Sequence, residues 1–464
     1  MSLLIKNGTI LTSTNEYVAD IYVKDEKITA IGKDLNYKVD NVYDATGKYI
    51  FPGGIDEHVH YGSFGSLTFE TTNAAIVGGT TTIVDFAPQP KGVSLKDAIN
   101  MHNKNLAENV AMTDYAFHGV IMDPKDSVLE ELKTLPEIGV STVKLFMAYK
   151  GSNFYVTDDA IFKAMQIARE SGVTIMVHAE NGELVDVLQK QLVAEGKTDP
   201  KYHYDSRPPL VEAEATQRAI YLSKIAKAPL FVVHVSCKEA MEAVRDANQA
   251  GHPVYGETCT HYLTLTVENL AKPNFEGAKY ICSPPLRPQE HLDALWNALD
   301  KNWLLAVGSD HCALKGGFQI TKKKGMGDFS KIPNGCPGVQ DRLSLLWSYG
   351  VETGKISKQK FIDVFTTTPA KIVGLYPEKG QIAVGSDADL IIFDPSYEGT
   401  ISVKDSLQGV DYNAFEGFKI KGRPEKVFLR GTLTAENGKF TGKLGQGKFL
   451  KAKPYGLCYD KFKK

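Results

Sequence analysis

Metal-binding and basic side chains recur in this sequence at the ends of short apolar runs. Histidine, aspartate and lysine are residues that bind or accompany divalent metal ions, and here each follows a run typical of a buried strand. Five fragments share this arrangement: residues 56–60 (DEHVH), 147–150 (MAYK), 177–181 (VHAEN), 233–236 (VHVS) and 308–312 (GSDHC). Polar groups at strand ends of a repeating β/α chain form the active sites of barrel enzymes, so the fragments predict one shared catalytic site.

Two of the histidines, His58 and His60, are separated by a single residue. Residues i and i+2 of a strand face the same side, so both imidazoles can reach one point. The pair alone is weak evidence, because two histidines on a strand can equally be packed core residues. His178 and His234 each end a run of their own, and Asp310 ends another. Four imidazoles and one carboxylate suit Zn²⁺ and related divalent ions, so the set predicts a metal site.

Lys150 follows the apolar run at residues 142–149. An ammonium group beside two cations is disfavoured by charge repulsion and by desolvation. A neutral lysine can instead add CO₂ to form an anionic carbamate, whose two oxygens could bridge two metal ions. We therefore predict a carboxylated Lys150 at the metal site; the alternative is a surface lysine after the fourth strand.

The elements that would position these residues alternate along the middle of the chain. Helical patterns, such as residues 160–170 and 239–250, separate apolar β-branched runs. With the run that ends at His60 there are eight, the others being residues 80–86, 114–121, 142–149, 173–178, 230–235, 253–258 and 304–309. Alternating strands and helices predict parallel β/α units. A count near eight favours a closed (β/α)₈ TIM-type barrel of the α/β class over an open doubly wound sheet.

Both ends of the chain have a different sequence pattern from the middle. Short β-prone pieces separated by turn residues occupy residues 3–5, 21–23, 28–31 and 41–43, and again 390–393 and 426–431. Such pieces predict hairpins in a small sheet. Neither end could form a full sandwich alone, so we predict a composite β-sandwich domain from residues 1–50 plus 375–464. The catalytic barrel would then span residues 51–374.

The composition excludes several classes of protein. The chain has 464 residues and a formal net charge of -2. It therefore lacks the excess of positive charge that is typical of proteins that bind nucleic acid or an anionic membrane. Its six cysteines, Cys458 among them, contain no C-x-x-C pair, and no apolar run approaches the roughly 20 residues that span a bilayer. A soluble cytoplasmic enzyme with a small-molecule substrate is expected. The run at residues 322–324 (KKK) is interpreted as a solvated loop, and His102, His203, His252 and His291 as surface or loop residues.

Taken together, the motifs resemble the dihydropyrimidinase/hydantoinase family of cyclic amidohydrolases. The resemblance covers nearly the whole chain, and the combination of motifs is specific although each motif alone is not. Besides the histidine pair at 58 and 60 it includes residues 51–54 (FPGG), 146–151 (FMAYKG), 178–182 (HAENG), 234–236 (HVS), 282–287 (CSPPLR), 309–312 (SDHC), 332–335 (IPNG) and 385–389 (GSDAD).

This resemblance implies a binuclear metal centre that opens a ring. His58, His60 and Asp310 would hold one ion and His178 and His234 the other, with carboxylated Lys150 bridging both. Zinc is the first candidate, with manganese or iron as alternatives. A metal-bridging hydroxide would attack the ring carbonyl, Asp310 would pass its proton to the departing nitrogen, and Tyr155 would stabilise the oxyanion. Backbone groups of Ser283 and Asn334 would bind the imide, and the enzyme would be a homotetramer.

The sequence leaves the substrate open. The expected substrates are 5,6-dihydropyrimidines or 5-substituted hydantoins, which would open to N-carbamoyl amino acids. The loop at residues 61–68 is shorter than in many hydantoinases, so the enantiomer preference is not defined. Thr260 and His261 are more reminiscent of allantoinases and dihydroorotases, although the segment after the histidine pair lacks the arginine that dihydroorotases use for a carboxylate. A non-enzymatic scaffold like the collapsin response mediator proteins is disfavoured, because those proteins have lost metal ligands.

Overall fold

A computed structural model describes residues 2–454 and 456, so Cys458 lies outside the described residues. Its centre is an eight-stranded parallel sheet that runs in chain order from β6 to β13. The sheet curls into a barrel, and the backbone N–H of His60 donates to the carbonyl of His311 where its two edges meet. The eight expected strands and the barrel are thus confirmed. Their bounds are β6 (Gly54–Val59), β7 (Thr80–Pro88), β8 (Asp114–Val120), β9 (Thr142–Phe146), β10 (Thr174–His178), β11 (Leu230–Val232), β12 (Val254–Cys259) and β13 (Ala306–Gly308).

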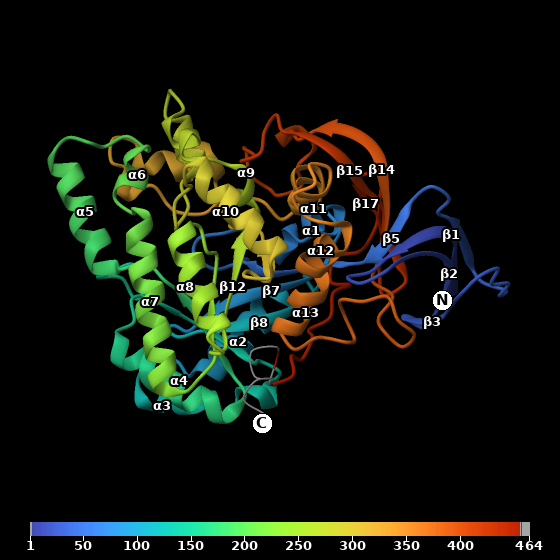
Figure 1. The fold of residues 1–464 in the computed structure, drawn as a ribbon, viewed down its shortest axis with the longest axis horizontal. Coiled ribbons are helices and arrows are strands. Elements are labelled where there is room, and N and C mark those ends of the chain that lie inside the picture. Colours follow the sequence, from blue (N-terminus) through green and yellow to red (C-terminus); the bar gives the residue numbers. More distant parts are fainter. Residues whose placement is uncertain (1, 455, 457–464) are drawn as a thin grey trace.

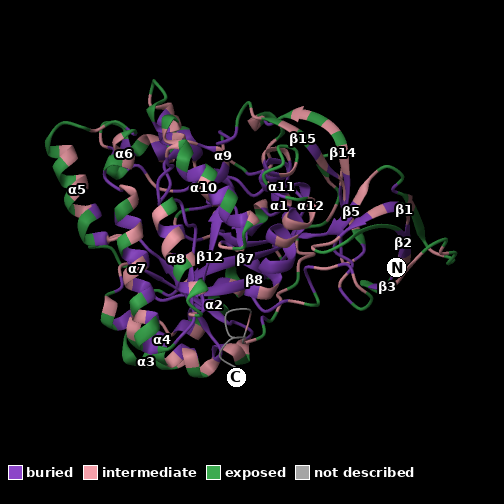
Figure 2. Ribbon diagram, viewed as in Figure 1, coloured by how far each residue is buried: buried purple, intermediate pink, exposed green. Residues whose placement is uncertain are grey.

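Helices surround this barrel (Figure 1). They are amphipathic: α8 buries Ala240, Met241, Val244 and Ala247, which recur on one side at helical spacing, and exposes its opposite face. Figure 2 shows the same division, with buried strands inside and exposed residues on the outer helices. The helices are α1 (Asn73–Val77), α2 (Leu95–His102), α3 (Asp126–Glu130), α4 (Asp158–Ser171), α5 (Gly182–Ala194), α6 (Tyr202–Asp205), α7 (Pro209–Ala226), α8 (Lys238–Gln249), α9 (Thr260–Thr264), α10 (Gln289–Asp300), α11 (Arg342–Leu346), α12 (Lys358–Ile362) and α13 (Thr368–Ile372). None of the described helices is long and apolar enough to cross a membrane.

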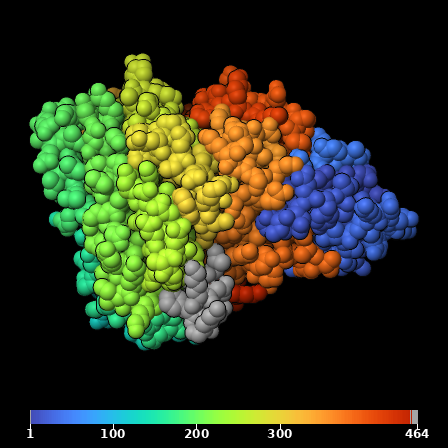
Figure 3. Space-filling view, viewed as in Figure 1, coloured from blue at the N-terminus to red at the C-terminus, as the bar shows by residue number. Residues whose placement is uncertain are grey.

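The two ends of the chain combine in a second sheet. Its nine strands run in the order β17-β16-β15-β14-β5-β1-β2-β3, with β4 also paired to β1. Most neighbours are antiparallel, while β1 pairs in parallel with β4 and then with β5. The expected all-β unit from both termini is confirmed, and its N-terminal strands form a lobe on one side of the molecule (Figure 3). The strands are β1 (Ser2–Leu11), β2 (Glu16–Lys24), β3 (Lys27–Gly32), β4 (Asn41–Asp44), β5 (Tyr49–Pro52), β14 (Leu390–Thr400), β15 (Lys419–Leu429), β16 (Thr432–Glu436) and β17 (Lys439–Phe440).

A buried ion network joins this terminal sheet to the barrel. Asp114, at the start of β8, is fully buried and pairs with Lys379 at 2.6 Å and with Arg430. The same carboxylate accepts a hydrogen bond from the backbone N–H of Lys448 at 2.9 Å. Lys379 also lies 2.6 Å from Asp389, and although burial opposes it, these carboxylates raise the pKa of Lys379. All three partners of this barrel carboxylate therefore come from the last quarter of the chain.

Candidate active site

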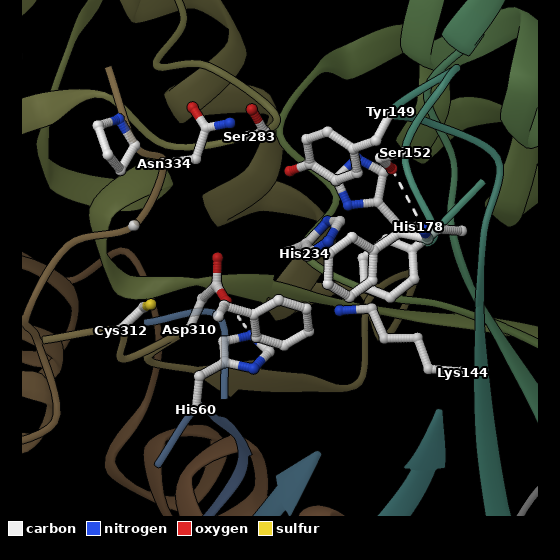
Figure 4. Close-up of a pocket in the computed structure, with 15 residues that line it drawn as sticks. His60, Lys144, Tyr149, Ser152, His178, His234, Ser283, Asp310, Cys312 and Asn334 are labelled. Atoms are coloured by element: carbon white, nitrogen blue, oxygen red, sulfur yellow. Dashed lines mark hydrogen bonds and ion pairs between the residues drawn. The ribbon is translucent and has the colours of Figure 1, made fainter. Parts of the chain in front are cut away.

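A cavity of about 480 Å³ opens at the carboxyl ends of the barrel strands (Figure 4). This is the end at which barrel enzymes carry their active sites, because the loops after the strands meet there. Most of the expected site residues line the cavity. Its walls are formed by His60, Phe64, Lys144, Phe146, Tyr149, Ser152, Phe154, His178, His234, Ser283, Asp310, Cys312, Pro333, Asn334 and Gly335.

His58, His60 and Asp310 form one cluster of potential ligands. One ligand atom from each lies within 4.8 Å of the others. The Oδ1 atom of Asp310 is 3.0 Å from His60 Nε2 and 3.3 Å from His58 Nε2. Burial alone would raise the pKa of Asp310, but the hydrogen bond and the charge of His60 lower it. Asp310 is therefore an ionised carboxylate. His58 Nδ1 pairs with Glu257, which fixes the ring so that its Nε2 faces the cavity.

His178 and His234 lie on the next part of the wall. Their ring centroids are 4.5 Å apart, and His234 is 5.3 Å from His58, so the four imidazoles form a continuous group. Nε2 of His178 is 2.7 Å from Glu180, which is also 2.7 Å from the guanidinium of Arg207. Burial alone would raise the pKa of Glu180, but Arg207 and His178 lower it. The ionised carboxylate therefore accepts a hydrogen bond from the protonated Nε2 of His178, and Nδ1 of the same ring keeps a free lone pair.

The structure brings Lys144, rather than Lys150, to the histidines. Lys144 is 1% exposed and its Nζ lies 3.1 Å from His58 Nε2, whereas the side chain of Lys150 is 45% exposed and pairs with Glu183. The reason is the alternation of β9: Val143 and Leu145 pack in the main hydrophobic core, so Lys144 between them points into the barrel. Burial lowers the pKa of Lys144 to about 8, with Asp310 and Glu257 acting in the opposite direction.

The structure also brings a different tyrosine to the cavity from the one that was expected. Tyr149 lines the cavity, whereas Tyr155 is not among the lining residues and its hydroxyl lies 3.3 Å from Glu183 near the surface. Burial is the main cause that raises the pKa of Tyr149, so its hydroxyl stays protonated and can donate a hydrogen bond. Lys144 lies within the strand run, where the alternation of side chains is the signal that points to it, whereas Tyr149 lies at the end of the run beside Lys150 and has no separate sequence signal.

Three residues of the site have left-handed backbone conformations just after their strands. These are Tyr149 (φ 64°), His234 (φ 41°) and Asp310 (φ 47°). Such angles are uncommon for residues with side chains, and where they occur at a site the surrounding structure must hold them. Each turn aims its side chain at the cavity, which Figure 4 shows for all three. Ser283 and Asn334 line the cavity on the opposite wall from Lys144.

Several polar residues that were expected at the surface or in loops are buried, and two of them, Lys322 and His203, contact the segment that carries Ser283. Lys322 is fully buried, and its Nζ donates to the carbonyls of Ile281 and Pro333, each at 2.8 Å. These carbonyls lie next to the segments of Ser283 and Asn334, so one ammonium group ties both segments together. His203 is likewise buried, as are His102 and His291, and only His252 is partly exposed as predicted.

An aromatic wall closes one side of the cavity. The ring centroid of Phe64 lies 5.0 Å from that of Phe154 and 6.1 Å from that of Phe146. Lys144 and Asp310 are the only lysine, arginine or acidic residues among the described residues that line the cavity, and no arginine lines it. The space above the ligand cluster is therefore suited to a neutral ring with an apolar substituent.

The donor set fits divalent metal ions. His60 Nδ1 and His234 Nδ1 are buried without a hydrogen-bond partner among the described residues. Burial is the largest cause that lowers the pKa of His58 and of His234 well below the ordinary histidine range, so both rings are neutral and could bind a cation. Lys144 Nζ lies beside an imidazole, with no carboxylate within ion-pair distance in the described chain. Neutral imidazoles, one carboxylate and an uncompensated buried amine match the requirements of zinc and related ions.

Comparison with known proteins identifies relatives along the whole chain. The profile of the amidohydrolase family matches residues 49–434. The D-hydantoinase of Geobacillus stearothermophilus is 48% identical over 464 residues, covering 98% of each chain. The dihydropyrimidinase of Rattus norvegicus is 40% identical, covering 98% of this chain and 89% of that protein. Among solved structures, the dihydropyrimidinase of Brevibacillus agri NCHU1002 superposes with a TM-score of 0.95 at 46% identity, covering 98% of this chain and 100% of that one.

Proposed function

Since this chain belongs to the amidohydrolase family, in the group of hydantoinases and dihydropyrimidinases, we propose that it hydrolyses the ring amide bond of a cyclic ureide. The substrates would be 5-substituted hydantoins or 5,6-dihydropyrimidines, and the products N-carbamoyl amino acids. The observation that carries this proposal is the convergence of four histidines, Asp310 and buried Lys144 beneath a cavity without an arginine. That convergence also disfavours the non-enzymatic scaffold.

We infer that the site holds two divalent ions. His58, His60 and Asp310 would hold one and His178 and His234 the other, with zinc as the first candidate and manganese or iron as alternatives. Lys144 would take the role expected of Lys150: its neutral amine would add CO₂ to give a carbamate anion and release one proton, and the carbamate oxygens would be available to hold metal. Two bound ions would supply a water that ionises near neutral pH and would polarise the ring carbonyl.

The side chains of the cavity supply the remaining steps. Asp310 lies where it can accept a proton from the attacking water and deliver it to the ring nitrogen, which leaves poorly unless protonated. The Tyr149 hydroxyl can donate to the oxygen that becomes negative in the transition state. Ser283 and Asn334 would hold the imide through their backbone groups, and the side-chain oxygen of Asn334 is buried without a partner among the described residues.

A panel of four rings tests the proposed function. The zinc-loaded protein would be assayed with dihydrouracil, a 5-substituted hydantoin, allantoin and dihydroorotate. We expect the first two to be preferred in kcat/KM, because the cavity offers no arginine to a substrate carboxylate. Preference for allantoin or dihydroorotate would reassign the chain to those enzymes. No turnover of any ring, with two metal ions bound, would contradict the proposal altogether.

Replacing Tyr149 by phenylalanine is expected to lower kcat by about 10²- to 10³-fold, because one oxyanion donor is lost. KM and bound metal should change little, since the hydroxyl is not a ligand. Tyr155→Phe is the matched control: it removes the same hydroxyl from a residue that lies outside the cavity, and kcat should stay near the wild-type value. A larger loss in Tyr155→Phe than in Tyr149→Phe would reverse the assignment.

Replacing Lys322 by methionine should lower kcat/KM without loss of metal. The change leaves the buried carbonyls of Ile281 and Pro333 without a donor and frees the segments of Ser283 and Asn334. A displaced substrate loses activity steeply, so we expect a fall of roughly 10- to 100-fold. Metal content by mass spectrometry should remain that of the wild type. The neighbouring exposed lysine provides the control, because Lys324→Met should leave both quantities unchanged.

We propose that the protein is a cytoplasmic homotetramer. Five cysteines in the described chain are free thiols, which supports a reducing compartment and hence the cytoplasm. A homotetramer is proposed from the family resemblance. Light scattering on the purified protein would measure the assembly directly.

A further inference from the structure

A second, smaller pocket adjoins the catalytic cavity. This side pocket has a volume of about 200 Å³ and shares Tyr149, Ser152 and Asn334 with the cavity wall. Helix α5 forms one side of it, and the segment around Phe329 another (Figure 1 shows α5 at the outer edge). Most of its side chains are polar or charged, unlike the aromatic wall around Phe64. The residues that line it besides the shared three are Lys150, Gly182, Val185, Asp186, Gln189, His203, Arg207, Phe329, Ser330 and Ile332.

His203 presents an unused acceptor at this side pocket. The residue is 2% exposed, and its Nε2 lies 2.8 Å from the carbonyl oxygen of Cys282. A carbonyl can only accept, so Nε2 must carry the ring proton. Burial, followed by the nearby Arg207, lowers the pKa of His203 to about 3, so the ring is neutral. Its Nδ1 is therefore a bare lone pair, and it is buried without a partner among the described residues.

Arg207 presents an unused donor at the same pocket. The residue is 3% exposed, and its Nη1 donates to Glu180 at 2.7 Å. Its Nε is buried, and no described residue accepts from it. A buried polar atom without a partner carries a substantial penalty, so two such atoms in one pocket point to a group that satisfies both. That group must accept from Arg207 and donate to His203.

Resting on the proposed function, we propose that the side pocket receives the carbamoyl end of the ring-opened product. Hydrolysis breaks the ring C–N bond: the carbonyl carbon gains an oxygen from water, and the nitrogen gains a proton. The reaction thus creates a carboxylate at the catalytic centre and a terminal H₂N–CO–NH group that is no longer tethered. The carbamoyl oxygen would accept from Arg207 Nε, and the new NH₂ group would donate to His203 Nδ1.

The charges of the side pocket favour this neutral group over a carboxylate. Arg207 is already paired with Glu180, and Lys150 with Glu183. Asp186 on the wall is likewise paired, with Lys190 at 2.7 Å, and the lone pair of His203 would repel an anion. A terminal urea matches one donor and one acceptor without adding charge. It has few atoms, and a pocket of about 200 Å³ has room for it.

A pair of ligands that differ in one group tests the proposal. N-carbamoyl-phenylalanine and N-acetyl-phenylalanine differ only in a terminal NH₂ against CH₃. With the zinc-loaded wild type, inhibition of hydantoin hydrolysis should give a Ki about 10-fold lower for the carbamoyl compound, because CH₃ leaves His203 Nδ1 unpaired. Equal Ki values would overturn the proposal. If the wild type hydrolyses no cyclic amide, the proposed function fails first and this inference fails with it.

The variant His203→Gln assigns the preference to the side pocket. Glutamine can keep the donor to Cys282 while it removes the Nδ1 acceptor, so the ratio of the two Ki values should fall to within about 2-fold. His252→Gln is the control, since this residue bonds Ser223 far from the site. A ratio unchanged in His203→Gln would overturn the proposal.

A crystal structure keeps the test independent of how well the variant folds. In the wild-type holoenzyme with N-carbamoyl-phenylalanine, the terminal nitrogen should lie within hydrogen-bond distance of His203 Nδ1. A water molecule between His203 and Arg207, with the carbamoyl group elsewhere, would overturn the proposal.

Discussion

Lys144→Ala is expected to lose most of its bound metal and at least about 10³-fold in kcat/KM, because the variant could not form the carbamate that we propose at this position. The side chain is almost fully buried beside His58, so no other residue can take its place at that point. Metal content by mass spectrometry and hydantoin hydrolysis would be measured on the same preparation. Acetate or propionate should restore part of both, because each supplies the two carboxylate oxygens that the alanine variant lacks.

The matched control for this change is Lys150→Ala. Lys150 is exposed and pairs with Glu183, so its removal should leave metal content and kcat close to wild type. The two variants differ only in which lysine of one segment is removed. Full activity in Lys144→Ala together with loss in Lys150→Ala would return the bridging role to Lys150 and contradict the geometry of β9.

Asp310→Asn is expected to lower kcat by about 10³- to 10⁴-fold, since the amide can neither take up a proton nor pass one to the leaving nitrogen. The loss should persist at saturating zinc, which separates proton transfer from weakened metal binding. Metal content should fall only in part, because His58 and His60 remain close together. Steady-state kinetics with added zinc would measure both effects.

Asp341→Asn serves as the control for this substitution. Asp341 is also a buried carboxylate, but it bonds Gln408 and Asn413 and does not line the cavity. The variant should therefore keep a kcat near wild type. A comparable loss in both variants would mean that removal of any buried carboxylate disturbs the barrel, and Asp310 would lose its specific role.

The barrel and the terminal sheet could be predicted from the sequence because both depend on local patterns. Each barrel strand is buried on both faces and therefore appears as a short apolar β-branched run, as at residues 230–235. Helices such as α8 carry their apolar residues at helical spacing. The histidines and Asp310 lie at the ends of such runs, so the rule that barrel sites lie at strand ends located them.

The position of Lys144 follows from the alternation of side chains along strand β9. Lys144 is the only charged residue within β9 and lies between the core residues Val143 and Leu145. The alternation of side chains along β9 places Lys144 inside the barrel. Residues 146–151 led to the predictions of Lys150 and Tyr155, and in the structure Lys150 is exposed and Tyr155 is not among the residues that line the cavity.

The side pocket and the Lys322 anchor could not be predicted from sequence patterns. Lys322 belongs to a run of three lysines that is typical of a solvated loop, and His203 lies in a polar segment. Both are buried because distant segments fold over them: Ile281 and Pro333 in one case, Cys282 in the other. Such contacts depend on the tertiary arrangement of loops, which local periodicity does not contain.

The ion network around Asp114 has a consequence for how the protein is made. A ribosome that has released residues 1–374 has already delivered all the proposed metal ligands. Asp114, however, still lacks Lys379, Arg430 and the amide of Lys448, which emerge only later. A carboxylate enclosed between the barrel and the terminal sheet is strongly unfavourable unless it is paired, so this interface depends on those partners. The nascent chain is therefore expected to reach its native packing only when translation is nearly finished. Catalytic activity should appear only after the C-terminal residues have been synthesised.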